Sequence, residues 1–402
     1  MLNTRPGRHV LAMIAAAYFL AVFFSPQGIS YQRKADSLLG VPSHVFGDGF
    51  YHHLLAKSIA EKGVLYVAEK PADVLEYTKL RGGFSLGKDG MVYITALPGI
   101  SLLAAPFYRV FGIPGYYLLN ALLGVVTCWF VYRTCRLHVN EDAAAKTTLF
   151  FGLGTIIFTY SQYFYSDILS CALLAGSFYH LLRGQPVISG LLAGLLLITK
   201  APLALAAVVF CTYLFSKGGW RKHAFFAAGF ALTAWTFFAY NILCFGGPFA
   251  TGYGSELHVV DGVQNAINVN SLDYWGKNPL KTVPLYTLVL VLTNPLLIVS
   301  AAGLRRWGDV ERVLAALFIV FALVYGVRSD GIGGWCWSWR FMLPMTALAA
   351  LPAAKAVEER LVPDRWIWAL FYLSVYLCLL SLAPVGWHIQ TNLVDAALGF
   401  LG

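Results

Sequence analysis

Residues 10–24 read VLAMIAAAYFLAVFF, a run without a single charged side chain. Stretches of this kind recur as far as residue 386, in a chain of 402 residues that is 58% apolar and only 12% charged. A soluble domain carries roughly 25% charged residues, whereas a membrane span needs about 20 mostly apolar residues. The sequence therefore predicts a polytopic membrane protein, for which lipid acts as the solvent.

The apolar stretches predict about eleven transmembrane helices in one all-α membrane domain that covers residues 1–402. The expected segments are residues 10–28, 115–135, 145–165, 167–183, 187–199, 202–216, 223–244, 284–304, 310–327, 341–354 and 366–386. The fifth and sixth are short and are separated by Lys200-Ala201-Pro202, so they form either two spans or one shallow hairpin. The first run follows Arg5 and Arg8 as in a signal peptide, but no small-residue cleavage site is evident, and we expect an uncleaved span.

Basic residues in the short connections set the expected orientation, because short cytoplasmic loops are enriched in Lys and Arg. With a cytoplasmic N-terminus, the inner connections contain Arg5, Arg8, Arg133, Arg136, Lys146, Arg183, Lys217, Arg221, Lys222, Arg305, Arg306, Arg312, Lys355, Arg360 and Arg365. We therefore expect the N-terminus inside and the C-terminus outside. The outer side has comparable Lys and Arg in total, but most fall in the long segment 29–114, where this rule has little weight. Across the chain, whose net charge is +9, the basic residues are scattered between apolar segments and form no long basic stripe, which argues against nucleic acid as a partner.

Two polar segments on the outer face, residues 29–114 and 245–283, are too long to be simple turns, and long loops often carry function. Within the first, Tyr51–Val67 has the apolar spacing of an amphipathic helix, which we expect to lie along the membrane surface. Leu97–Phe111 predicts a second interfacial helix, because its prolines and glycine argue against one straight span.

The run FGDGFYHH at residues 46–53 places Asp48 between two glycines, directly before the expected amphipathic helix. One interpretation is a general base, since glycines let the backbone approach a substrate and a carboxylate near the lipid boundary is partly desolvated. The other interpretation is that Asp48 caps the N-terminus of the helix. The two roles are compatible.

Histidines near this run raise the question of a metal site. His44, His52 and His53 lie within ten residues of one another, but adjacent histidines on a helix point about 100° apart and no HxxxH or HExxH pattern is present. The seven cysteines show neither metal-ligand spacing nor a disulfide framework. We therefore expect hydrogen-bonding or interfacial histidines, and no metal or other cofactor.

Six sequence motifs follow one another across nearly the whole chain. They are GKDGMVY at residues 87–93, LPGISLLAAPFY at 97–108, YSQYFYSD at 160–167, GLLAGLLLITKAP at 190–202, YNILCFGGPFATGY at 240–253 and GGWCWSWRFMLP at 333–344. Together with the acidic residue in the first outer loop, their order resembles the GT-C class of polytopic glycosyltransferases, in particular the superfamily of protein mannosyltransferases and aminoarabinose transferases. Such enzymes take a sugar from a polyprenyl-phosphate carrier on the outer face of the membrane.

The resemblance implies a GT-C-like helix bundle and an inverting sugar transfer. In that scheme Asp48 removes a proton from an acceptor hydroxyl or amine, which attacks the anomeric carbon opposite the departing carrier phosphate. Lys200 and Arg340 are the expected ligands of that phosphate, and snorkelling of either side chain to the membrane surface is the alternative. Position 50 is Phe50, so Asp48 lacks the second acid of a DxD pair, although some relatives bind a divalent ion at acidic residues of the outer loops.

Other outer side chains are expected to contact the sugar or the acceptor, namely Tyr51, His52, Lys88, Tyr93, Asp167, Trp335, Trp337 and Trp339. The three tryptophans stand at alternate positions and share one face of an extended segment, which suits stacking on a sugar ring. An aromatic belt at the interface is the alternative. Further outer polar groups are Glu256, Asp273, Arg328 and Asp330.

The expected partners are a polyprenyl-phosphate sugar such as one carried on undecaprenyl phosphate, a lipid, glycan or protein acceptor, and membrane lipids. The resemblance places the protein in the inner, plasma membrane with its active site outside. A transporter or lipid flippase is the competing hypothesis, since many spans and buried charges suit it, but the sequence shows no second interrupted hairpin in a repeated half. A third possibility is a scaffold that keeps the fold without catalysis.

Overall fold

A computed structural model gives the architecture of the protein. It describes residues 6–24, 47–75, 78, 83–260, 263–268, 277–305, 308–328, 336–382, 390, 392–394 and 396–397. Among the positions singled out from the sequence, His44, Asp273, Asp330 and Trp335 lie outside these residues.

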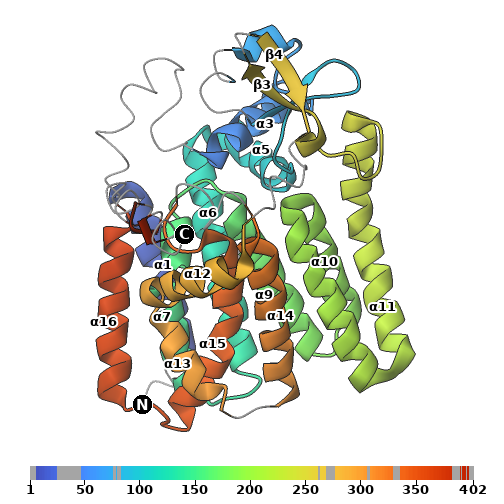
Figure 1. Ribbon diagram of the computed structural model, residues 1–402. Helices are drawn as coiled ribbons and strands as arrows, with labels where there is room; N and C mark the ends of the chain where they lie inside the picture. The colour runs from blue at the N-terminus through green and yellow to red at the C-terminus, as the bar shows by residue number, and fades with distance from the viewer. Residues whose placement is uncertain are drawn as a thin grey trace.

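Most of the described chain is an upright bundle of helices (Figure 1). Its helices are α1 (Pro6–Phe24), α6 (Pro114–Cys135), α7 (Glu141–Gly154), α8 (Ile156–Tyr160), α9 (Ser166–Leu182), α10 (Pro186–Lys200), α11 (Ala206–Phe245), α12 (Pro279–Thr293), α13 (Leu296–Gly303), α14 (Asp309–Gly326), α15 (Leu343–Glu358) and α16 (Asp364–Leu380). Short 3₁₀ turns are η1 (Pro71–Val74), η2 (Ala201–Leu205), η3 (Gly252–Gly254) and η5 (Arg340–Met342). At one end of the bundle lie α3 (Asp48–Lys62), α5 (Gly99–Phe111) and a small sheet.

Several of these helices are long and apolar enough to cross a membrane. Within the described residues four pass by length and composition, namely Pro114–Cys135, Pro186–Lys217, Gly219–Phe245 and Arg340–Glu358. A fifth is formed if α12 and α13, which are bent by 109° relative to each other, make one broken span. Four or five candidate membrane spans are therefore present among these residues, and the expected number of about eleven stays a prediction. The remaining expected segments contain the helices α1, α7, α9, α14 and α16.

Two expected segments are interrupted by backbone breaks, and two further breaks fall between one expected segment and the next. Thr155 is extended and separates α7 from α8, where one helix over 145–165 was expected. Gly219 has a φ of 71° and turns α11 back on itself, so this helix is a hairpin of two legs. Lys200 ends α10 and is followed by the turn η2, which agrees with the interruption expected at Lys200-Ala201-Pro202. The expected segment 284–304 breaks between α12 and α13 at Asn294 and Pro295.

Small residues let α10 pack closely against the second leg of α11. A Cβ atom added to Gly190 would lie 2.1 Å from the carbonyl oxygen of Phe226, and one added to Gly194 would lie 2.4 Å from that of Phe230. Close backbone approach through small residues is a common way for helices to associate in a membrane. The glycines of the GLLAG motif thus explain why these two helices form one unit (Figure 1).

A four-stranded antiparallel sheet in the order β2-β1-β3-β4 joins the two segments expected to be outer loops. Its strands are β1 (Phe84–Leu86), β2 (Val92–Ile94), β3 (Glu256–Val260) and β4 (Val263–Ile267). β1 pairs with β3 through Ser85 and Glu256, and the Glu256 carboxylate accepts a hydrogen bond from the Gly83 amide at 2.8 Å. The expectation of an all-α chain is therefore wrong in this part, because two loops far apart in sequence complete each other's backbone hydrogen bonds.

The two expected interfacial helices are present with shifted ends. α3 begins at Asp48, three residues earlier than expected, and ends at Lys62, since Gly63 adopts a left-handed φ of 71° and stops it. α5 covers residues 99–111, close to the expected range. Much of α3 is buried against α5 and the sheet, so this helix is held by protein contacts as well as by any membrane surface.

Candidate active site

Four charged side chains from distant parts of the sequence meet at the end of the bundle that carries α3. Arg340 donates a hydrogen bond from Nη2 to Oδ2 of Asp48 at 2.8 Å. Its Nε lies 3.7 Å from Oδ2 of Asp167, and Lys200 forms an ion pair with the other oxygen of Asp167. We call Asp48, Asp167, Lys200 and Arg340 the charge cluster. The structure thus brings together Asp48, Lys200 and Arg340, the three residues that the sequence placed at one boundary.

The members of the charge cluster differ in exposure. The side chain of Asp167 is 1% exposed, that of Arg340 7% and that of Lys200 13%, whereas that of Asp48 is 48% exposed. Buried charges are stable only when paired, so Asp167 holds the two cations together. Asp48 is the carboxylate of the cluster that an incoming molecule can reach.

The glycines around Asp48 explain its position. Gly47 is the N-cap of α3, with a φ of 57°, and Asp48 is the first residue of the helix, so the interpretation of Asp48 as the N-cap is wrong. A Cβ atom on Gly49 would lie 2.5 Å from the carbonyl oxygen of Phe164. The glycines therefore let the start of α3 lie close to the backbone that precedes α9, the helix that carries Asp167. The expected close approach to a substrate is not their role here.

Charge dominates the acidity of Asp48. Burial by itself raises the pKa of this carboxyl, but the positive charges of Arg340 and Lys200 and the hydrogen bond from Arg340 outweigh it, so the pKa lies below its usual value. Asp48 is consequently ionised at neutral pH and held by Arg340. A ligand that draws Arg340 away would raise the basicity of Asp48.

The two histidines of α3 serve as buried hydrogen-bonding groups. Nδ1 of His52 lies 3.1 Å from the Ser101 hydroxyl, and Nδ1 of His53 lies 3.0 Å from the Tyr116 hydroxyl. Burial lowers the pKa of each ring to about 4, so both are neutral at pH 7. Across the described residues, no three His, Cys, Asp or Glu side chains are grouped as a metal site.

A strained turn sets the position of Arg340. Ser338, two residues before it, has a φ of 63°, which non-glycine residues rarely adopt. Its hydroxyl accepts hydrogen bonds from Thr293 at 2.6 Å and from Nδ2 of Asn294 at 3.2 Å, at the break between α12 and α13. The Oδ1 atom of Asn294 accepts from the Ile156 amide at 2.9 Å. The helix break therefore anchors the turn that leads to Arg340.

Aromatic rings surround the cations of the cluster. Nζ of Lys200 lies 4.3 Å from the centre of the Phe341 ring, and the guanidinium carbons of Arg340 and Arg328 lie 5.2 and 5.1 Å from it. The ring of Tyr165 also faces Arg340 at 5.0 Å. Arg328, expected only as a general outer polar group, is thus a third cation beside this ring. Cation–π contact stabilises such charges where water is scarce.

Sequence reasoning missed Ser338, Asn294 and Phe341 as residues that shape the site. One signal was available for Asn294, because it interrupts an apolar segment where polar groups are costly and often functional. Asp167 was expected to contact sugar or acceptor, and its burial between Lys200 and Arg340 assigns it first to holding those cations.

The other expected sugar or acceptor contacts lie outside the charge cluster. Trp339 is fully buried with its ring against Tyr286, and Trp337 is 7% exposed, so neither ring is an open stacking surface here. The Tyr51 ring packs on Phe84 of the sheet. Lys88 donates to the Ile242 carbonyl at 2.8 Å, and Tyr93 donates to Asp89 at 2.8 Å.

Comparison with known proteins identifies the fold of the chain. No family model matches the chain, and no curated protein sequence matches it. The structure is similar to that of ArnT from Cupriavidus metallidurans bound to undecaprenyl phosphate, with a TM-score of 0.59 and 14% identity over 88% of this chain and 61% of that one. The chain has a GT-C fold. It spans about three fifths of the length of the ArnT chain.

A second similar structure comes from an archaeon. The apo oligosaccharyltransferase of Archaeoglobus fulgidus matches with a TM-score of 0.53 and 13% identity, over 97% of this chain and 56% of that one. The same enzyme tethered to an acceptor peptide with the NVT sequon matches with a TM-score of 0.52 and 12% identity. The GT-C fold expected from the sequence motifs is thereby confirmed. Because the sequence identity is low, these structures assign no role to individual residues.

Proposed function

We propose that this protein is an inverting glycosyltransferase that moves a sugar from a polyprenyl-phosphate carrier to an acceptor. The observation that carries the proposal is the charge cluster, in which one accessible carboxylate, Asp48, lies beside two buried cations, Lys200 and Arg340. The chain shares its fold with the structure of ArnT bound to undecaprenyl phosphate. This similarity supports a polyprenyl-phosphate carrier for the present protein. The tethered acceptor peptide of the archaeal oligosaccharyltransferase supports a protein among the acceptor classes, beside lipid and glycan.

In the proposed reaction Asp48 takes a proton from the acceptor hydroxyl or amine. The acceptor atom forms a bond to the anomeric carbon, while the bond from that carbon to the carrier phosphate oxygen breaks and the phosphate leaves with the electron pair. Lys200 and Arg340 neutralise the leaving phosphate, with Arg328 as a further cation near Phe341. When the phosphate engages Arg340, Asp48 loses its partner and becomes a stronger base at the moment the proton must move.

The proposed orientation places the charge cluster on the extracytoplasmic face of the inner, plasma membrane. About eleven spans, a cytoplasmic N-terminus and an outer C-terminus complete this topology, with residues 29–114 and 245–283 as the outer segments of a single domain over 1–402. The turn in the middle of α11 and the connection from α15 to α16 carry basic residues and lie at the end of the bundle away from the sheet (Figure 1), which supports the assignment of that end to the cytoplasm.

A transporter or flippase is the competing function. The broken pair α12 and α13 favours it, because discontinuous helices often form transport sites. However, the polar groups at this break are buried and already hydrogen-bonded within the protein, since Asn294 bonds to Ile156 and Ser338. The break therefore anchors the turn before Arg340, which supports the glycosyltransferase over the transporter.

The test is a transfer assay with purified protein in detergent. Undecaprenyl-phosphate sugars are supplied with lipid, glycan and peptide acceptors, and release of free undecaprenyl phosphate is measured together with labelled product. The proposal predicts that labelled product and free undecaprenyl phosphate form in equal amounts. Movement of the intact carrier across a liposome membrane without its cleavage would establish the transporter instead.

A further inference from the structure

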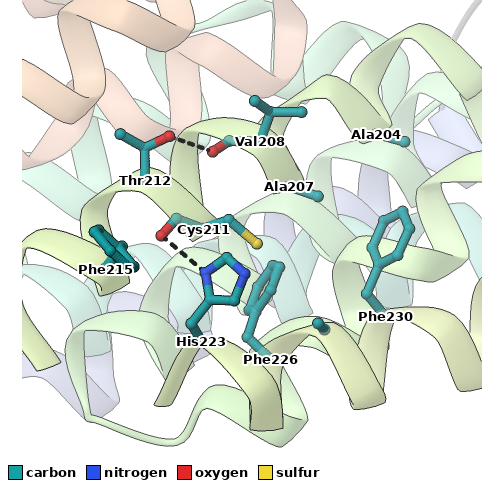
Figure 2. Close-up of a pocket in the computed structure, with 10 residues that line it drawn as sticks. Ala204, Ala207, Val208, Cys211, Thr212, Phe215, His223, Phe226 and Phe230 are labelled. Carbon is teal, nitrogen blue, oxygen red and sulfur yellow. Dashed lines mark hydrogen bonds between the residues drawn. The ribbon is translucent and has the colours of Figure 1, made fainter. Parts of the chain in front are cut away.

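An apolar groove lies between the two legs of α11, away from the charge cluster. It has a volume of about 520 Å³ and is lined by Ala204, Ala207, Val208, Cys211, Thr212, Phe215, His223, Phe226, Ala227 and Phe230 (Figure 2). Alanines on both legs leave the space that the larger side chains border. Both legs belong to helices long and apolar enough to span a membrane, so we expect the groove to lie at the depth of the lipid chains.

The groove is about as long as one leaflet is thick. Its wall on the first leg runs from Ala204 to Phe215, which at about 1.5 Å per residue covers about 16 Å. The hydrocarbon core of a bilayer is about 30 Å thick, so the groove covers about half of it. One acyl chain from a single leaflet fits this length.

The two ends of the groove differ in polarity. At the Ala204 end the lining is apolar, with Phe230 on the second leg, whereas at the other end Nδ1 of His223 lies 3.5 Å from the Cys211 carbonyl oxygen (Figure 2). The Thr212 hydroxyl is satisfied by the Val208 carbonyl at 2.9 Å and offers no competing polar site in the middle. An amphipathic ligand would therefore place its polar end near His223.

Positive charge lies next to that polar end. Arg221 and Lys222 immediately precede His223 and are exposed, and Trp220 is 71% exposed beneath the Arg221 guanidinium, 5.9 Å from it. Lys217, on the other side of the turn, is paired with Asp309 of α14. Exposed basic residues at a span end attract anionic headgroups, and tryptophan favours the same interfacial depth.

We propose that this groove binds an anionic glycerophospholipid, with one acyl chain between the legs of α11 and the headgroup on Arg221 and Lys222. A polyprenyl phosphate held at Lys200 would enter the groove from the opposite, Ala204 end and would leave Arg221 and Lys222 unused. The charge at the turn therefore favours the phospholipid. This site is separate from the charge cluster and does not depend on the sugar transfer proposed above.

The experiment is native mass spectrometry of the full chain with added lipid. Phosphatidylglycerol and phosphatidylcholine with identical acyl chains are compared for the wild type, and we expect phosphatidylglycerol to bind about tenfold more tightly. Arg221→Gln and Lys222→Gln should each remove much of this preference. Ala227→Trp, a change at an exposed groove position, should reduce the binding of both lipids by filling the groove.

Arg365→Gln is the matched control, because Arg365 is an exposed cation at the start of α16, outside the groove, and its loss should leave the lipid preference unchanged. Equal binding of the two lipids to the wild type would overturn the proposal, as would unchanged binding in Ala227→Trp. Undecaprenyl phosphate that displaces phosphatidylglycerol and is itself lost in Ala227→Trp would assign the groove to the carrier instead.

Discussion

Arg340 and Asp48, 292 residues apart in the sequence, are joined by a hydrogen bond of 2.8 Å between Nη2 and Oδ2. The arginine is buried and the carboxylate is half-exposed, so the pair lies at the boundary between the helix bundle and the space that a substrate can enter. One contact thereby couples the start of α3 to the turn before α15. The proposed chemistry depends on this contact being exchanged when a phosphate arrives.

Loss of Asp167 should destabilise the protein more than loss of an exposed, ion-paired carboxylate. Asp167→Asn would leave Lys200 and Arg340 without their shared buried partner, which costs about 3–5 kcal/mol in such cases. Thermal unfolding in detergent measures the effect. Asp309→Asn is the control, since Asp309 pairs with Lys217 at an exposed site and should change the melting temperature little. Similar melting temperatures for the two variants would contradict the role of Asp167.

The strain at Ser338 predicts an unusual order of stability between two variants. Ser338→Ala and Ser338→Gly both remove the hydroxyl that Thr293 and Asn294 contact, and they differ in how well they tolerate a φ of 63°. Glycine adopts this conformation freely, so Ser338→Gly should be more stable than Ser338→Ala by about 1 kcal/mol. An alanine variant that melts at the same temperature as the glycine variant, or higher, would show that the turn is not strained.

Close packing at Gly49 predicts a loss of activity at a residue that carries no functional group. In Gly49→Ala the new methyl group would meet the Phe164 carbonyl oxygen at 2.5 Å, and α3 must move away. Displacement of a catalytic group by about 1 Å can cost about 100-fold in rate, so transfer should fall by up to that factor. Gly254→Ala is the control, because nothing lies within 4 Å of its Cβ position. Equal rates of sugar transfer by Gly49→Ala and Gly254→Ala would show that the position of α3 does not affect catalysis.

Acid should unfold the protein through His52. Burial lowers the pKa of this ring from 6.5 to about 4 in the folded protein, so the unfolded state binds the proton more readily between these values. The stability that the neutral ring contributes is complete above pH 6.5 and is lost as the pH falls toward 4, by roughly 3 kcal/mol. His52→Gln can keep a hydrogen bond to Ser101 without the titration, and its free energy of unfolding should fall less steeply over this range. An unchanged slope would mean that His52 is charged in the folded protein.

The meeting of Asp48, Lys200 and Arg340 followed from the sequence because all three were predicted on one face of the membrane, Lys200 and Arg340 beside apolar segments and Asp48 in the first outer loop. The pairing of Lys200 and Arg340 with Asp167 did not follow, since it depends on how α9 packs beside α10 and α15. The strands were missed because three residues such as Phe84–Leu86 are too short to show a period, and their partner at Glu256 is far away in the chain. Trp339 shows the same limit: alternate spacing placed it on an open face, and packing against Tyr286 encloses it.

The most direct test of the account is the rate of sugar transfer from an undecaprenyl-phosphate donor by Asp48→Asn compared with the wild type. Asn keeps the size of the side chain and removes its basicity, and Glu61→Gln, an exposed acid on the same helix, is the matched control. General-base catalysis contributes about 100-fold to 10,000-fold, so we predict a loss of that size for Asp48→Asn and little change for Glu61→Gln. Transfer by Asp48→Asn at the wild-type rate would contradict the account.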